Sequence, residues 1–64
     1  MNIGDKVYQY DNSGKIYESI ILHISNDGIF HTTTIDFDYQ AIGHTIFTTK
    51  EDAQKAFKYG IGGD

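Results

Sequence analysis

Hydrophobic and polar residues alternate along three stretches in the first half of the chain, which is the pattern of half-buried β-strands. The stretches are residues 6–10 (KVYQY), 15–25 (KIYESIILHIS) and 29–35 (IFHTTTI). The second is longer than an ordinary strand, so we expect a bend near Glu18 and Ser19. One of its faces, which we expect to meet the core, carries Ile20, Leu22 and Ile24. The opposite face, expected toward solvent, carries Tyr17, Ser19, Ile21 and His23.

The two segments between these stretches have the composition of tight turns. DNSG (residues 11–14) and SNDG (25–28) both combine small polar residues with a final glycine. This matches a type I turn closed by a left-handed glycine, the three-residue hairpin loop with a bulge. Two such hairpins in a row predict three antiparallel strands. In the second hairpin, residues whose numbers sum to 54 should face each other, which places His23 opposite His31.

The period of the pattern changes in the second half of the chain. DFDYQAIG (residues 36–43) has no clear element; if it is extended, Asp36 and Asp38 point one way and Phe37 and Tyr39 the other. The next four residues, HTIF (44–47), predict a short last strand.

A helix of about ten residues is expected from residue 50 onward. Thr49 is placed as its N-cap, and Asp52 three residues later resembles a capping box with Asp in place of Glu. The acidic residues come first and Lys55 and Lys58 later, which matches the helix dipole. The buried stripe would consist of Ala53, Ala56 and Phe57. Gly60 is a natural stop with Ile61 packing back on the last turn, and 61–64 are expected to be a flexible tail.

These elements predict an α+β fold in one domain, residues 1–60. The sheet would be a small curled antiparallel meander of four or five strands, SH3-like in its curvature, with one C-terminal helix. We expect the helix to cover the apolar face of the sheet, formed by Ile20, Leu22, Ile24 and Phe30.

Composition and charge narrow the function classes. The 64 residues contain no Cys, which excludes disulfides and thiolate zinc sites, and no Arg, while the net charge is −4. Nucleic-acid binding usually depends on a basic face, so this balance argues against it. Neither a signal peptide nor an apolar run long enough for a membrane span is evident, and a cytoplasmic location is expected. A core this small also favours a homodimer or docking onto a larger protein.

The stretch IGHTIFTTKEDAQKAF (residues 42–57) resembles a signature of very small proteins from Gram-positive bacteria and their phages. In that signature Ile-Gly is followed by two variable positions, a hydrophobic residue, Phe, a variable position, Thr, two charged residues, an acid and Ala. The matching residues are Ile42, Gly43, Ile46, Phe47, Thr49, Lys50, Glu51, Asp52, Ala53 and Phe57. His44 stands where Lys is common, and Asp52 where Glu is common. The resemblance implies an accessory protein of a phage or mobile element, a group that includes anti-CRISPR inhibitors.

No motif for catalysis is present. The sequence has no Gly-x-Ser-x-Gly, and GIGGD lies after the last helix, where a phosphate-binding loop does not belong. We therefore expect no enzyme and no cofactor. His23 and His31 are candidate metal ligands, with His44 or Asp38 as a third; the alternative is that they are two unrelated exposed histidines.

Aromatic and acidic residues suggest contact with a host or phage protein. Exposed tyrosines are effective anchors, and carboxylates can compete for the basic groove of a nuclease. The expected partner-binding residues are Tyr8, Tyr10, Tyr17, Asp36, Phe37, Asp38 and Tyr39. Two other interpretations remain open: these residues pack the fold or keep it solvated, or the tyrosines stack nucleic-acid bases while Lys6 and Lys15 contact phosphate.

Overall fold

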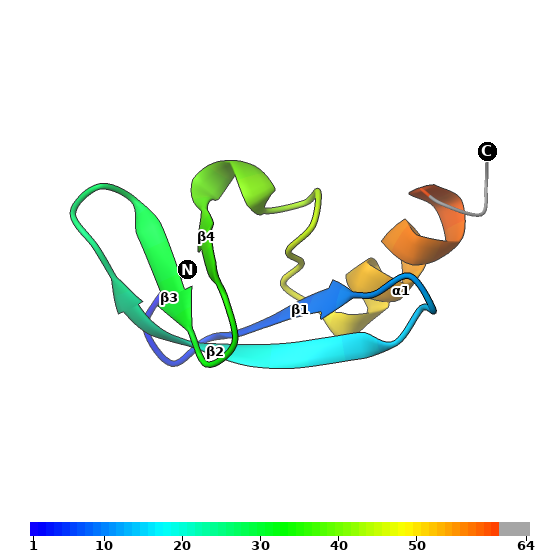
Figure 1. Cartoon of the computed structure of the whole chain (residues 1–64), viewed down its shortest axis with the longest axis horizontal. Helices are drawn as coiled ribbons and strands as arrows, with labels where there is room; N and C mark the ends of the chain where they lie inside the picture. Colours follow the sequence, from blue (N-terminus) through cyan, green and yellow to red (C-terminus); the bar gives the residue numbers. More distant parts are fainter. Residues whose placement is uncertain (61–64) are drawn as a thin grey trace.

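The computed structural model describes residues 1–60 and contains one antiparallel sheet followed by one helix (Figure 1). The strands pair in chain order, β1-β2-β3-β4, and the sheet curls into a half-barrel. The elements are β1 (Lys6–Tyr10), β2 (Ile16–Ile24), β3 (Ile29–Thr32), β4 (Asp36–Asp38), the 3-10 helix η1 (Tyr39–Ala41) and α1 (Lys50–Gly60). The predicted fold class is confirmed.

Both hairpin loops form as predicted. Gly14 and Gly28 have φ angles of 88° and 87°, in the left-handed region that glycine adopts without steric cost. The amide of Gly28 donates to the carbonyl of Ser25 at 3.1 Å, which closes the second turn. In the register of β2 with β3, His23 faces His31, as the turn type requires.

The third strand ends at Thr32, three residues earlier than predicted. The Thr32 hydroxyl donates to the carbonyl of Ile35 at 2.6 Å and accepts from the amide of Ile35 at 3.0 Å. This side chain closes a tight turn inside the threonine run, because a threonine hydroxyl can substitute for backbone partners. The chain then returns as β4, which pairs with β3.

A β-bulge in β2 reverses the expected inner and outer faces of this strand. The register shifts between Ile21, opposite Thr32, and His23, opposite His31, so Leu22 is an extra residue. Ile21 is fully buried, whereas Leu22 is 56% exposed. The predicted core face was therefore wrong for Ile20 and Leu22, which lie outside, and for Ser19 and Ile21, which lie inside. Ile24 does contact the core, because the bulge restores the alternation one residue later.

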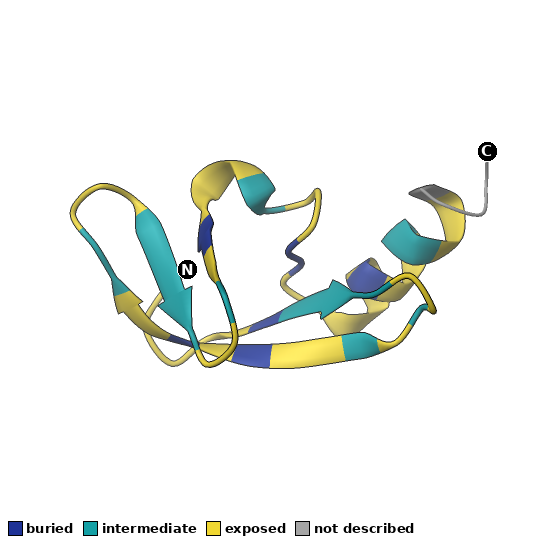
Figure 2. Ribbon diagram, viewed as in Figure 1, coloured by how far each residue is buried: buried dark blue, intermediate teal, exposed yellow. Residues whose placement is uncertain are grey.

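The main core lies on the concave side of the sheet (Figure 2). Its buried residues are Val7, Ile21, Phe37 and Ile46, and the partly buried residues packed against them are Ile24, Phe30, Ile35, Ala41 and Ile42. The segment 39–47 thus supplies much of its cover. The predicted strand 44–47 is wrong: Phe47 only makes an isolated bridge with Tyr8, with two backbone hydrogen bonds of 2.8 Å. Such a bridge leaves Ile46 and Phe47 on opposite sides of the segment.

The helix packs elsewhere than predicted. Its N-terminus is capped as expected, since the amide of Asp52 donates to Thr49 Oγ1 at 3.0 Å. Its main contacts, however, are with β1 and β2, where the Phe57 ring meets Tyr10 edge-on at 5.5 Å. Figure 1 shows α1 beside the β1–β2 hairpin, at the opposite end of the molecule from β3 and β4. The expected cover of Leu22 and Phe30 by the helix is wrong.

The β1–β2 hairpin is therefore packed on both of its faces. Val7 and Tyr10 are three residues apart on a regular strand, so their side chains leave β1 on opposite faces. Val7 faces the main core, while Tyr10 stacks on Phe47 at 6.0 Å and contacts α1. Gly60 is the last residue of α1; the predicted packing of Ile61 and the tail 61–64 lie outside the described residues. The helices within residues 1–60 are too short or too polar to cross a membrane.

Candidate functional site

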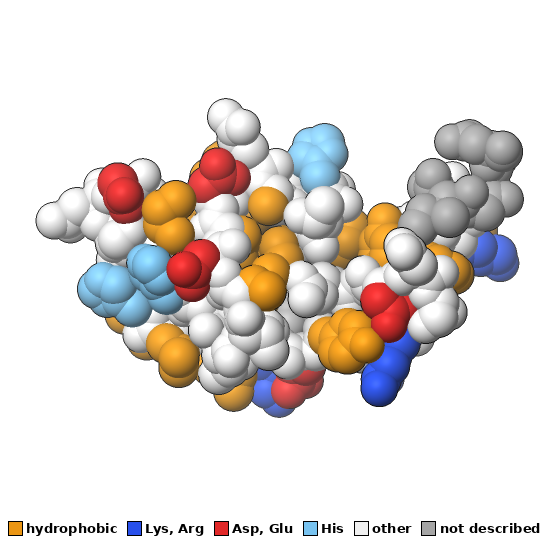
Figure 3. Space-filling view, in the orientation of Figure 1, with side chains coloured by type: hydrophobic (Ala, Val, Ile, Leu, Met, Phe, Trp, Pro, Cys, Tyr) orange, Lys and Arg blue, Asp and Glu red, His pale blue; other side chains and the backbone are white. Residues whose placement is uncertain are grey.

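Three polar side chains form a row across the curled sheet. His23 on β2 faces His31 on β3, and His31 in turn faces Asp36 on β4. The two imidazole rings stack with centroids 5.6 Å apart and an angle of 30° between their planes. Nδ1 of His31 lies 3.1 Å from Oδ1 of Asp36. Figure 3 shows neighbouring histidine side chains with carboxylates close by at the end of the molecule that bears the second hairpin, and a further histidine apart from them.

The structure connects Asp36 to His31, which the sequence pattern did not reveal. Asp36 was expected only as a partner contact. Its register depends on the turn closed by Thr32, because without that turn β3 would continue in the same direction and Asp36 would not return beside it. In the sequence, the only sign of this turn was the threonine run, because a threonine hydroxyl can substitute for a backbone hydrogen-bond partner.

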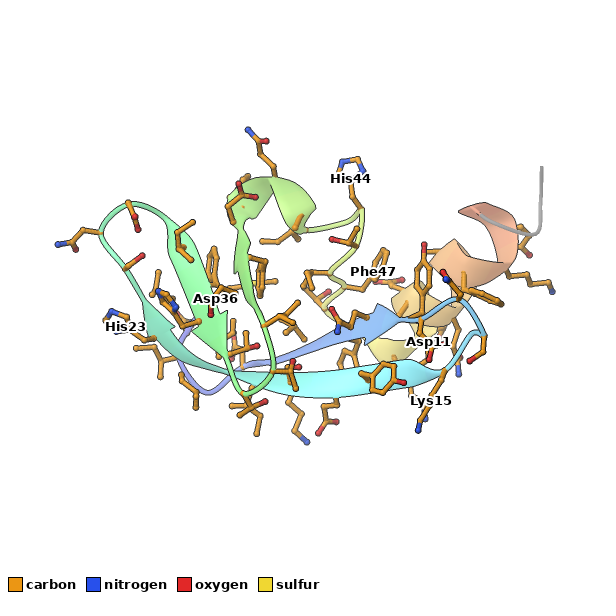
Figure 4. All side chains as sticks on the ribbon, in the orientation of Figure 1. Asp11, Lys15, His23, Asp36, His44 and Phe47 are labelled. Carbon is orange, nitrogen blue, oxygen red and sulfur yellow. The ribbon has the colours of Figure 1, made fainter. Side chains whose placement is uncertain are left out.

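The predicted third metal ligands do not join this row. Figure 4 shows His44 on the loop after η1, well away from His23. Asp38 pairs with Ile29, two positions further along β4 than the partner of His31. Within residues 1–60, no three side chains of His, Cys, Asp or Glu converge on a common point. The described residues therefore offer two imidazoles here, with one carboxylate in contact with His31 and no third ligand.

Asp36, the last residue of this row, also belongs to an exposed edge of the sheet. We call Asp36, Asp38 and Tyr39 the acidic edge. Asp38 caps η1, because its Oδ1 accepts from the amide of Gln40 at 3.1 Å. This turn projects Tyr39 outward, 76% exposed. Phe37 between the two aspartates is only 7% exposed and stacks on Phe30 at 5.0 Å. Of the four predicted partner-binding residues in this segment, Phe37 is a core residue and the other three lie on the surface.

Charge is distributed unevenly along the molecule. Residues 21–49 contain Asp27, Asp36 and Asp38 but no lysine, and so carry −3. Residues 1–20 carry −1, from three acids and two lysines, and residues 50–60 carry +1, from three lysines and two acids. The Ser25 hydroxyl donates to Asp27 and holds the pKa of that carboxyl below its usual value. At neutral pH the segment that contains β3 and β4 thus carries three carboxylates and no lysine.

The other predicted tyrosines do not share a surface with this edge. Tyr8 and Tyr10 are half-buried, and Tyr10 packs between Phe47 and Phe57. Tyr17 lies at the first turn, where its hydroxyl donates to Asp11, and Figure 4 shows Asp11 well away from Asp36. The seven predicted partner-binding residues therefore do not form one surface: Phe37 is in the core, and Tyr17 leaves the β1–β2 hairpin on the face opposite Tyr8 and Tyr10.

Asp11 organises the first turn and holds Tyr17. Its carboxylate accepts from the Ser13 hydroxyl at 2.6 Å, from the Tyr17 hydroxyl at 2.9 Å and from the amide of Lys15 at 3.0 Å. These donors, the Ser13 hydroxyl most strongly, hold the pKa of Asp11 well below its usual range. The same contact raises the pKa of Tyr17, because the neutral hydroxyl is the form that donates. We interpret this network as structural, since it fastens the hairpin loop.

An open depression of about 400 Å³ lies near the N-terminus, lined by Met1, Gly4, Asp5, Lys6 and Thr48. It is separate from the histidine row and from the acidic edge. At its rim, Nζ of Lys6 lies 3.9 Å from Oε2 of Glu18. An exposed ion pair of this kind contributes little to stability. The polar side chains that line the depression are Asp5, Lys6 and Thr48.

Comparison with known proteins returned no match to any family model, curated protein or solved structure. The interpretation of the site therefore depends on its geometry.

Proposed function

We propose that this protein is a non-enzymatic binding module whose acidic edge contacts a basic surface on a larger protein. The observation that carries the proposal is the combination of Asp36, Asp38 and the exposed Tyr39 within residues 21–49, which contain no lysine. A uniformly acidic surface speeds association with a basic partner and disfavours acidic ones. An exposed tyrosine beside it supplies apolar contact area at small entropic cost.

The resemblance to accessory proteins of phages and mobile elements supports a host protein as the target. The basic groove in which a nuclease, such as a CRISPR effector, holds nucleic acid has the complementary charge. Asp36 and Asp38 leave one face of β4 two residues apart, a separation of roughly 6.7 Å along a strand. Two carboxylates at this spacing present a close pair of negative charges, which is complementary to a basic groove.

Binding of nucleic acid by this chain is supported less well. Stacking platforms need free aromatic faces, but Tyr10 is packed between two phenylalanines. Lys15 lies over the ring of Tyr17, with Nζ 5.3 Å from the centroid, and Lys6 lies beside Glu18. Four of the groups expected to stack bases or to contact phosphate, Tyr10, Tyr17, Lys6 and Lys15, thus have partners within the protein.

A pull-down from a Gram-positive host lysate, followed by affinity measurement with the captured protein, tests the proposal. Tyr39→Ala and Asp38→Asn should each weaken binding, and asparagine keeps the cap of η1. The matched controls are Tyr59→Ala and Asp52→Asn, which remove the same groups from the exposed surface of α1. Binding should also weaken as salt rises. If the control variants lose as much affinity as the edge variants, or if only RNA or DNA is retained, the proposal is wrong.

A further inference from the structure

We propose that His23 and His31 together bind one late first-row divalent metal ion, Zn²⁺, Ni²⁺ or Cu²⁺, with Asp36 as a positioning residue. The site would lie on the outer surface of β2 and β3, and water would complete the coordination. This inference can hold whether or not the proposed function does, since its two ligands lie on β2 and β3, only Asp36 is common to both, and it requires no protein partner.

The first argument is the spacing of the two rings. A β-ladder fixes directly opposed residues, and here the stacked imidazoles have centroids 5.6 Å apart. Two ring nitrogens bound to one ion at about 2.0–2.1 Å each are at most about 4.2 Å apart, so the facing nitrogens of the two rings must approach more closely than the ring centroids. Because Asp36 holds the ring of His31, the nitrogens would be brought together by rotation of the exposed His23 side chain.

The second argument is the contact with Asp36. Histidines that bind metal commonly donate their other ring N–H to a carboxylate, which fixes the tautomer and the orientation of the ring. Nδ1 of His31 is 3.1 Å from Oδ1 of Asp36, and this leaves Nε2 of His31 free to act as a ligand. The side chain of His31 is 39% exposed, so an ion from solvent can reach it. A histidine that only packed against its neighbours would not need this orientation.

The third argument is the local charge. Asp27 lies in the turn that joins the two strands bearing the histidines. Together with Asp36 it makes the surroundings of the histidine pair negative, and residues 21–49 contain no competing lysine. Imidazole selects zinc, nickel and copper, whereas calcium and magnesium prefer oxygen ligands. The site should therefore discriminate between these two groups of ions.

Isothermal titration of the full chain with Zn²⁺, Ni²⁺ and Cu²⁺, each in a weakly coordinating buffer, tests the inference. We expect one ion per chain, with Cu²⁺ bound most tightly, and no heat of binding with Mg²⁺ or Ca²⁺. His23→Ala and His31→Ala should each abolish saturable binding. Acidification should weaken binding, because protons compete for the imidazole nitrogens.

Two matched controls separate this site from binding to scattered surface groups. His44→Ala removes an exposed histidine outside the row and should leave the affinity unchanged. Asp36→Asn should weaken binding about tenfold through loss of ring orientation. Asp38→Asn removes the same charge from the same strand and should have a much smaller effect. Urea unfolding of each variant without metal verifies that the fold is retained.

The inference is overturned if His23→Ala binds the metal ion as tightly as the parent chain does. It is also overturned if His44→Ala loses as much affinity as His23→Ala or His31→Ala. A ratio of one ion per two chains, with doubled mass in light scattering, contradicts the single-chain site. Equal losses in Asp36→Asn and Asp38→Asn contradict the positioning role of Asp36.

Discussion

Gly14 and Gly28 close equivalent turns in different surroundings, so the same substitution at each isolates the packing of the helix. Their φ angles are 88° and 87°, and an alanine at either pays a left-handed backbone cost of about 1–2 kcal/mol. A Cβ at Gly28 meets nothing within 4 Å. A Cβ at Gly14 would lie 2.8 Å from Cε2 and 3.0 Å from Cζ of Phe57, closer than van der Waals contact allows.

The Phe57 ring can swing away from an alanine at Gly14, and the cost of doing so sets the difference between the two variants. Moving the ring disrupts its edge-on contact with Tyr10, worth about 0.5–1.5 kcal/mol beyond simple burial. We therefore expect Gly28→Ala to lose about 1–2 kcal/mol. Gly14→Ala should lose about 1 kcal/mol more than Gly28→Ala. For a domain whose whole stability is about 3–5 kcal/mol, both losses are readily measured.

Urea unfolding followed by far-UV circular dichroism is the appropriate assay. With a slope of about 1 kcal/mol per molar urea, the midpoint of Gly14→Ala should lie roughly 1 M below that of Gly28→Ala. In a Phe57→Leu background, which removes the outer ring atoms, the two alanine variants should become nearly equal. Equal midpoints in the parent background would refute the placement of α1 against the first hairpin.

Three further predictions concern the helix cap, the bulged strand and the first turn. Thr49→Ala should lower the free energy of unfolding by about 1 kcal/mol in urea titrations, because Thr49 Oγ1 accepts an amide hydrogen bond at the helix start. Ile21→Val should lower the free energy of unfolding by about 0.5–1.5 kcal/mol, and Ile20→Val by less, because Ile21 is fully buried whereas Ile20 is 37% exposed. A larger loss for Ile20→Val in urea titrations would contradict the bulge. The folded pKa of Asp11 is below its ordinary value of 3.8, so its contribution to stability is present above that pH and lost as the pH falls further. Urea midpoints of Asp11→Asn should accordingly fall less than those of the parent chain between about pH 5 and pH 2, and a parallel fall would exclude this role.

Features governed by near neighbours in the chain were predictable from the sequence. The two glycine-closed turns and the helix beginning after Thr49 depend on side chains within a few residues of the backbone groups they serve. The position of His23 opposite His31 followed directly from the turn type between them. The two proposed metal ligands were therefore predictable from local sequence, whereas the carboxylate beside them was not.

The remaining features depend on contacts between distant segments. Alternation predicts which residues share a face only while the strand is regular, and the bulge at Leu22 exchanged the faces of β2. The amphipathic pattern showed that the helix needs an apolar surface but did not specify which one. In the structure, segment 39–47 covers the concave face of the sheet, and α1 packs beside Tyr10 on the opposite face. Asp36 meets His31 only because the chain turns at Thr32. A sequence pattern determines local geometry, whereas the choice among competing surfaces is made by packing of the whole chain.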